Sequence, residues 1–155
     1  MKKRLLSVIG LAAASMLILA GCAGADNTAP ALKPAASFAA GSTMEILSKA
    51  GTITIGTKFD QPLFGLKGPD GPVGFDVQIG ALIAASLGIK ASKITFVETV
   101  SANREPFIQS GQVDLVIATY TINDKRKAVV SFAGPYYEAG QSILVKADNS
   151  SIKSE

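Results

Sequence analysis

The chain has 155 residues, of which 15 are lysine or arginine, 12 are aspartate or glutamate, one is cysteine and none is histidine. The absence of histidine excludes histidine-based catalytic triads and disfavours most zinc sites, and a single cysteine cannot form a disulfide within the chain. Residues 1–21 hold three of the basic residues, and the remainder carries twelve residues of each sign. The sequence pI near 9.0 therefore does not argue for nucleic-acid binding.

The start of the chain resembles the signal of a bacterial lipoprotein. A basic start, residues 2–4, is followed by an uncharged apolar stretch, residues 5–20, that is short for a membrane span. The stretch ends in LAGC, which resembles a lipobox, the motif in which the cysteine is lipidated and becomes the first residue. We expect residues 1–21 to be a signal peptide and Cys22 to anchor the protein at the extracytoplasmic face of the cell membrane. The alternative is an ordinary signal peptide with an unrelated cysteine.

A change in composition separates a linker from a folded region. Residues 22–43 are rich in alanine, proline, serine and glycine, and we expect the lipidated cysteine to be followed there by a flexible tether. From residue 44 to residue 155 the pattern is that of a folded domain. A helical turn is expected at residues 44–47, and the β-branched run TITIGT predicts a strand over residues 52–57. The segment GPDG, residues 68–71, predicts a turn.

An apolar pattern with helical spacing follows the turn. Phe75, Ile79, Leu82 and Ile83 lie at positions i, i+4, i+7 and i+8, and a glycine follows as a stop signal. We therefore predict an amphipathic helix over residues 75–87 that buries this face.

The remaining predicted elements alternate between strands and helices. Strands are predicted over residues 94–97, 114–118 and 142–145, and helices over residues 103–110 and 123–130, the last capped by its first asparagine. Alternation of this kind is typical of an α/β domain with a largely parallel sheet.

Ligands of such sheets bind beyond the carboxyl ends of the strands. Three of the predicted loops leave those ends, and they deliver Lys58, Arg104 and Arg126. Thr119 and Thr121 come just before the last of these. Because hydroxyls beside a planar guanidinium can hold a carboxylate, the sequence predicts a site for a small anion at this edge.

Four segments, in this order, resemble a known family of solute-binding proteins, the polar amino-acid binders of ABC importers (bacterial extracellular solute-binding proteins, family 3). The resemblance covers about residues 50–150 and is nearest to glutamate/aspartate binders. The family fold has two α/β lobes that close over one ligand at a hinge. The resemblance implies that residues 44–155 form one lobe of this periplasmic-binding-protein-like fold and the start of the hinge, without the second lobe. The segments are GTKFDQP (56–62), GPVGFDVQIGALIA (71–84), SANREPFIQSGQVDLVIATYTINDKR (101–126) and VSFAGPYY (130–137).

The resemblance also implies roles for the candidate site residues. Arg126 matches the arginine that pairs with the ligand α-carboxylate, and the hydroxyl of Thr121 would donate to the same group. The carbonyl of Thr119 would accept from the ligand ammonium. Arg104 matches an arginine that reaches the side-chain carboxylate in acidic amino-acid binders, and Lys58 would add a second cation there. The alternatives are ordinary surface charges and threonines placed by strand propensity.

Neighbouring residues are expected to be mainly structural. Asp76 suits the first turn of a helix, where a negative charge complements the helix dipole. Tyr136 and Tyr137 are expected to pack near the hinge. Phe59, Asp60 and Phe64 either shape the pocket or pack beside it.

These roles predict an acidic ligand, L-glutamate or L-aspartate. Glutamine would leave two cations underpaired, and an unpaired partner of a buried charge pair costs about 2–5 kcal/mol. The expected partners are the permease and ATPase subunits of an importer, and the expected mechanism is closure about a hinge. No metal, cofactor or enzymatic activity is expected, because no catalytic motif is present. The alternatives are a remnant that does not bind, a dehydratase-like enzyme of the same fold and a receptor sensor domain.

Overall fold

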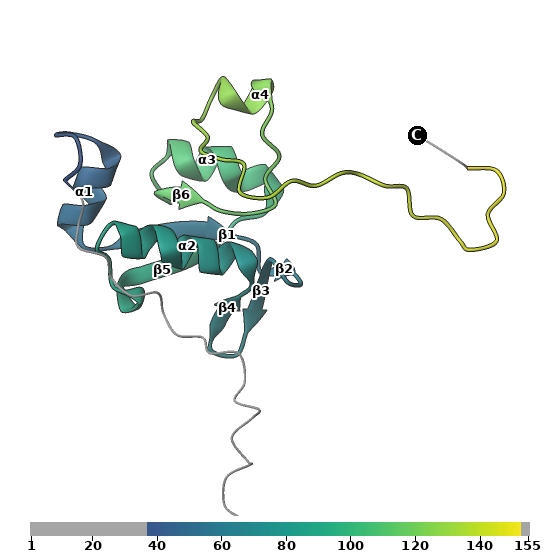
Figure 1. Ribbon diagram of the computed structural model, residues 1–155, viewed down its shortest axis with the longest axis horizontal. Helices are drawn as coiled ribbons and strands as arrows, with labels where there is room; N and C mark the ends of the chain where they lie inside the picture. The colour runs from purple at the N-terminus through teal and green to yellow at the C-terminus, as the bar shows by residue number, and fades with distance from the viewer. Residues whose placement is uncertain (1–36, 153–155) are drawn as a thin grey trace, which may run out of the picture.

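A parallel three-stranded sheet lies at the centre of the computed structural model, which describes residues 37–152 (Figure 1). The strand order is β5-β1-β6. β1 (Ile53–Thr57) pairs with β5 (Ile94–Glu98) along its whole length and with β6 (Leu115–Val116) through two residue pairs. The α/β class and the parallel sheet are thereby confirmed, although β6 is shorter than predicted.

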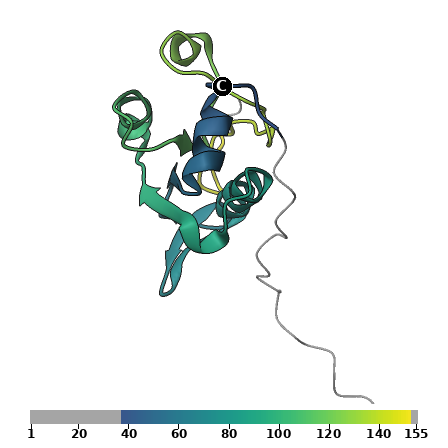
Figure 2. The same cartoon turned by 90° about the vertical axis from the view of Figure 1, so that its left-hand side faces the viewer.

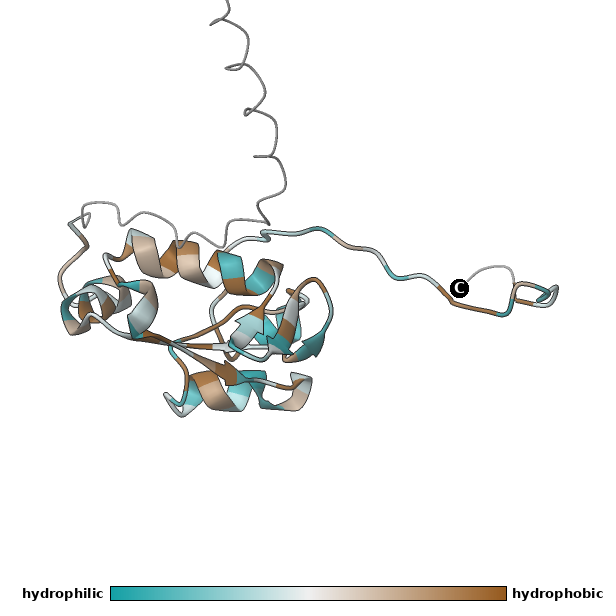
Figure 3. Ribbon diagram, turned by 90° about the horizontal axis from the view of Figure 1, so that it is seen from below, coloured by the Kyte–Doolittle hydropathy of each residue, from teal (hydrophilic) through white to brown (hydrophobic). Residues whose placement is uncertain are grey.

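The core forms around β1, the middle strand of this sheet. Ile53 and Ile55 are almost completely buried, and hydrophobic residues gather along the central strands and the helices beside them (Figure 3). Gly56 allows the loop after β5 to approach closely, since a Cβ there would lie 2.4 Å from Oγ1 of Thr99. The other buried members of the core are Leu47, Ala84, Leu87, Ile89 and Ile117.

Helices connect the strands and end at recognisable caps. The side chain of Ser42 accepts a hydrogen bond from the Glu45 amide at 3.2 Å, and that of Asn123 accepts one from the Arg126 amide at 3.0 Å. The cap at Asn123 was predicted from the sequence. The first helix lies at the end of the domain opposite to the C-terminal segment (Figures 1 and 2). The helices are α1 (Thr43–Ala50), α2 (Phe75–Ser86), α3 (Arg104–Gln109) and α4 (Asp124–Lys127), with 3-10 turns η1 (Ala91–Lys93) and η2 (Ser101–Asn103).

The buried face of α2 differs from the predicted one. Ile79 and Ile83 pack against the core, but Phe75 and Leu82 are 40% and 53% exposed. Small residues instead let the helix approach the sheet: a Cβ on Gly80 would lie 3.2 Å from side chains of β1 and β5. A helix that is apolar on several sides gives little information about which side packs inward. The buried residues are Asp76, Gly80, Ala84 and Ala85.

A small antiparallel sheet lies between β1 and α2, where the sequence predicted only a turn. It contains β2 (Asp60–Gln61), β3 (Gly65–Gly68) and β4 (Gly71–Val73), and the predicted turn joins β3 to β4. The first two backbone N–H groups of α2 donate to the carbonyls of Leu63 and Phe64 at 2.8 and 3.0 Å. Carbonyl groups of the small sheet's first turn therefore accept the hydrogen bonds of the free N–H groups at the start of α2, in place of a side-chain cap.

The C-terminal segment is extended and forms no regular element. Within residues 131–152 there is no helix or strand, so the strand predicted over residues 142–145 is wrong. Leu144 at its centre is 98% exposed, and the segment runs away from the sheet (Figure 1). A β-branched apolar run becomes a strand only where another strand completes its hydrogen bonds.

The predicted signal peptide, Cys22 and most of the predicted tether lie outside the described residues. Phe38, from the end of that tether, packs against the core. None of the helices described between residues 37 and 152 has the length and apolarity needed to cross a bilayer.

Candidate functional site

The loops that follow β1, β5 and β6, with the first turns of α3 and α4, meet at one edge of the sheet, which we call the strand-end rim (residues 58–64, 99–105 and 117–126). The amide of Thr99 donates to the carbonyl of Thr57 at 2.8 Å, which ties the first two loops together. The hydroxyl of Thr119 donates to Oε1 of Gln61 at 2.6 Å, which ties the first loop to the third. The prediction that these loops converge is therefore confirmed.

Arg104 begins α3 and points into the protein. It is 3% exposed, and its Nη1 donates to the carbonyl of Thr119 at 3.1 Å. Burial lowers the pKa of its guanidinium, and the charge of Arg126 lowers it further. The observed contacts make Arg104 a buried support of the strand-end rim, and its contact with a ligand side chain stays a prediction.

Arg126 is the more accessible of the two arginines. Its Nη1 donates to the carbonyl of Thr121 at 2.7 Å, and its Nε lies 3.2 Å from Oε1 of Glu105. The two side chains of this ion pair are 27% and 22% exposed. Thr121 thus supports Arg126 through its carbonyl, while its exposed hydroxyl remains a predicted ligand donor.

Tyr120 brings the two arginines together and was not predicted from the sequence. The guanidinium carbons of Arg104 and Arg126 lie 5.0 and 4.8 Å from the centre of its ring, within range of cation–π attraction. The ring of Phe132 packs edge-on against that of Tyr120, with 5.1 Å between the ring centres. Burial and the neighbouring Glu105 carboxylate raise the pKa of Tyr120 to about 12, so it is a neutral phenol at physiological pH.

Lys58 is not a free cation. Its Nζ lies 2.8 Å from Oδ1 of Asp60, in a pair whose lysine is well buried and whose aspartate is exposed. The pKa of Asp60 is lowered by the hydrogen bond from Lys58, and the charge of Arg104 adds to this, which places Asp60 near both cations. The sequence predicted Lys58 as a cation of the site and named Asp60 as a residue that could shape the pocket, but it did not predict that the two form an ion pair.

The charge balance of the strand-end rim follows from these contacts. Lys58 pairs with Asp60, Arg126 pairs with Glu105, and Arg104 is buried against Thr119. Two of the three cations thus already have a carboxylate partner, and the buried Asp76 carboxylate acts on the third, Arg104. The described side chains therefore leave little uncompensated positive charge for a ligand.

Several buried polar atoms also gather here. Four buried side-chain atoms have no hydrogen-bond partner within the described chain. A buried polar group without a partner costs about 1–3 kcal/mol, so a cluster of such atoms is typical of a functional edge rather than of a structural core. The atoms are Oγ1 of Thr57, Oδ2 of Asp76, Nε of Arg104 and the hydroxyl of Tyr120.

A partly buried hydrogen bond links the C-terminal segment to the strand-end rim. The hydroxyl of Tyr136 lies 2.8 Å from Oδ1 of Asp76 and 2.8 Å from the carbonyl of Ala118. Burial raises the pKa of Asp76, while the Tyr136 hydroxyl and the charge of Arg104 oppose the rise. Asp76 is thus more than a helix-dipole residue, because it also holds the segment that leaves the domain.

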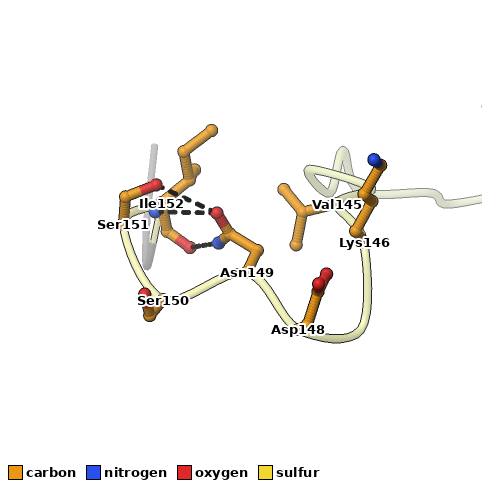
Figure 4. A pocket seen from close by; sticks show the side chains of 7 residues that line it. All are labelled: Val145, Lys146, Asp148, Asn149, Ser150, Ser151 and Ile152. Carbon is orange, nitrogen blue, oxygen red and sulfur yellow. Dashed lines mark hydrogen bonds between the residues drawn. The ribbon is translucent and has the colours of Figure 1, made fainter.

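Two hollows differ in their relevance to binding. One, of about 420 Å³, is lined by Arg126 and Glu105 together with residues of α4 and its flanks. The other, of about 460 Å³, is an open hollow lined by residues 145, 146 and 148–152 (Figure 4). Its turn is held by Asn149, whose Oδ1 and Nδ2 bond to Ser151 and Ile152 of the same loop. We therefore place the candidate site at Arg126. In residues 37–152 no group of histidine, cysteine or acidic side chains is placed to hold a metal ion.

Comparison with known proteins finds a matching family model and several similar sequences. Residues 53–153 match the model of the bacterial extracellular solute-binding proteins, family 3. A glutamine-binding protein of Geobacillus stearothermophilus is 38% identical over 144 residues, which are 90% of this chain and 55% of the relative. A glutamate-binding protein of Corynebacterium efficiens is 42% identical over 108 residues, or 66% of this chain and 37% of the relative. The chain thus spans about half or less of the length of these relatives.

A solved structure shows the same fold in an isolated domain. The arginine-bound form of domain 1 from TmArgBP is 31% identical, with a TM-score of 0.56. The match covers 61% of this chain and 74% of that domain.

Proposed function

Because it belongs to the bacterial extracellular solute-binding proteins of family 3, we propose that this chain binds a polar amino acid outside the cell for an ABC importer. The proposal concerns binding without covalent chemistry. Ligand binding would shift the protein toward a closed state that presents the amino acid to the transporter.

The contacts of Arg126 carry the proposal. A guanidinium has five N–H donors, and among the described residues Glu105 and the Thr121 carbonyl each engage one of its nitrogens. The remaining donors belong to a guanidinium that lies against the ring of Tyr120. The backbone of the same residue is held in place too, because its amide donates to the side chain of Asn123. Arg126 is thus held in place while part of its planar fork stays available for a ligand α-carboxylate.

The charge balance favours a neutral polar side chain on the ligand, with glutamine as the first candidate. The sequence predicted glutamate or aspartate because it counted Lys58 and Arg104 as cations free to bind a second carboxylate. Lys58 has the Asp60 carboxylate as a partner, and Arg104 donates to Thr119. Glutamate is the second candidate, supported by the 42% identical glutamate-binding relative.

A single lobe of this kind can bind an amino acid without a second lobe in at least one solved relative. Domain 1 of TmArgBP was solved with arginine bound, and the present chain covers 74% of it. We therefore propose that the residues of the strand-end rim hold the amino acid first. A second lobe, which the family fold has, would then add contacts to the ammonium and exclude water.

The test is titration calorimetry on the full chain with glutamine, glutamate, aspartate and arginine. Glutamine binding should be saturable in the wild type and should fall at least about 30-fold in Arg126→Ala, since loss of one partner of a desolvated charge pair costs about 2–5 kcal/mol. Lys127→Ala is the matched control, because Lys127 is exposed and, among the described residues, its ion pair is with Asp124 of the same short helix. Equal loss in both variants would remove Arg126 from the site.

We also propose that Cys22 carries a lipid that anchors the protein at the extracytoplasmic face of the membrane. The LAGC motif supports this proposal. Mass spectrometry of the protein from bacterial membranes should find the lipid on Cys22, and Cys22→Ser should release the protein from the membrane fraction. An unmodified Cys22 in the membrane-extracted protein would contradict it.

A further inference from the structure

Glu105 is a charged residue of the site to which neither the sequence nor the comparisons assign a role. It lies in the first turn of α3, next to the buried Arg104, and its Oε1 is 3.2 Å from Nε of Arg126. Its side chain is 22% exposed and lines the same hollow as the guanidinium. The Glu105 carboxylate therefore already engages one nitrogen of the Arg126 guanidinium, the group that would bind the ligand.

The surroundings keep this carboxylate charged and in place. Partial burial opposes its ionisation, but the nearby Tyr120 hydroxyl, its own backbone N–H and the charge of Arg126 outweigh burial and lower its pKa. The ring of Tyr120 packs against both arginines, which limits how far Arg126 can move from Glu105. The other charged groups around this contact are Arg104, which interacts with both partners, and Lys125, which lines the same hollow. Asp60 and Asp76 interact in turn with Arg104.

We propose that Glu105 is a specificity-determining residue that disfavours net-anionic ligands relative to zwitterionic ones, an inference that rests on the amino-acid binding proposed above. An amino acid such as glutamine brings one carboxylate and one ammonium to Arg126, so its net charge is zero. Glutamate brings a second carboxylate and a net charge of −1. The fixed charge of Glu105 repels the net-anionic ligand and leaves the net-neutral ligand nearly unaffected at longer range.

The contact would let this chain distinguish two ligands of nearly the same shape. Glutamine and glutamate differ by an amide and a carboxylate, so packing alone discriminates weakly between them. A fixed negative charge discriminates by repulsion, without a new attractive contact.

The experiment measures the dissociation constants of glutamine and glutamate for the full-chain wild type, Glu105→Gln and Asp70→Asn. Asp70 is the matched control, because it is an exposed carboxylate in the turn that joins β3 to β4 and its change alters the net charge by the same amount. The ratio of the glutamate constant to the glutamine constant should fall about tenfold in Glu105→Gln, the size expected for a unit charge at a partly exposed site. It should change less than about twofold in Asp70→Asn.

A second measurement does not depend on any variant. The same ratio in the wild type should fall as salt is raised from about 0.01 to 1 M, because screening weakens the repulsion. If both ligands bind and the ratio is unchanged in Glu105→Gln or insensitive to salt, the role of Glu105 is refuted while the proposed function stands. If the wild type binds no amino acid, both proposals fail.

Discussion

Replacing Tyr136 with phenylalanine should destabilise the fold at neutral pH, because it removes one hydroxyl and keeps the ring. That hydroxyl lies 2.8 Å from both Oδ1 of Asp76 and the carbonyl of Ala118. The side chain of Asp76 is fully buried, and its Oδ2 has no partner within the described residues. A hydrogen bond to a charged group contributes about 1.5–3 kcal/mol, so we expect a loss of this size in the free energy of unfolding.

The cost of Tyr136→Phe should also depend on pH. Burial raises the pKa of Asp76 above its ordinary value of 3.8. For a group whose pKa is raised in the folded state, the stability contributed by the protonated form is complete below the unfolded-state pKa. It is lost as the pH rises through the folded-state pKa. Removing the Tyr136 donor raises the pKa of Asp76 further, so the cost should be largest near pH 7 and should shrink as the pH falls toward about 4.

Urea unfolding of a double-mutant cycle at pH 7 and pH 5 measures this effect. Tyr136→Phe should cost less in an Asp76→Asn background, because no charge is then left without its donor. Tyr137→Phe is the control, since Tyr137 is 55% exposed and makes only ring contacts in the described structure, and it should stay within about 0.5 kcal/mol of wild type. The reasoning would be refuted if Tyr136→Phe cost less than about 0.5 kcal/mol at pH 7, or cost the same in both backgrounds.

Two further variants test the packing of the strand-end rim. Gly56→Ala should lower the free energy of unfolding by about 1–3 kcal/mol, because its Cβ would lie 2.4 Å from Oγ1 of Thr99; Gly140→Ala, with nothing within 4 Å, should be neutral in the same denaturation experiment. Tyr120→Leu should lower stability by about 1–3 kcal/mol through the loss of two cation–π contacts, and should weaken glutamine binding in calorimetry. Tyr120→Phe keeps the ring, so equal damage by both changes at Tyr120 would argue against a cation–π role.

The order of elements and the parallel sheet could be predicted from sequence because local signals dominate them. The glycine at residue 51 has φ 66° and ends α1, and Asn123 caps α4. The buried face of α2 could not be predicted, since Phe75 and Leu82 are as apolar as the residues that do face the sheet. The helix packs with Gly80 toward the sheet, because a larger side chain there would crowd β1 and β5. This requirement can be recognised only when the position of the sheet is known.

The sequence could predict that three cations gather at one edge of the sheet, but it could not predict which carboxylates pair with them. Loops at the carboxyl ends of parallel strands had to bring Lys58, Arg104 and Arg126 to one edge of the sheet. Glu105 lies next to Arg104 in the chain, yet it pairs with Arg126, 21 residues further on. Such long-range pairs have no periodicity or motif, so the charge pairing at this edge becomes visible only in three dimensions.

The central claim, that Arg126 receives the α-carboxylate of an amino acid at the strand-end rim, is tested most directly by a crystal structure of the full chain with glutamine. The account predicts the ligand carboxylate within hydrogen-bond distance of the Arg126 guanidinium, with the Lys58–Asp60 pair intact. A ligand bound elsewhere, for example in the hollow of residues 145–152, or bound with its carboxylate away from Arg126, would contradict it.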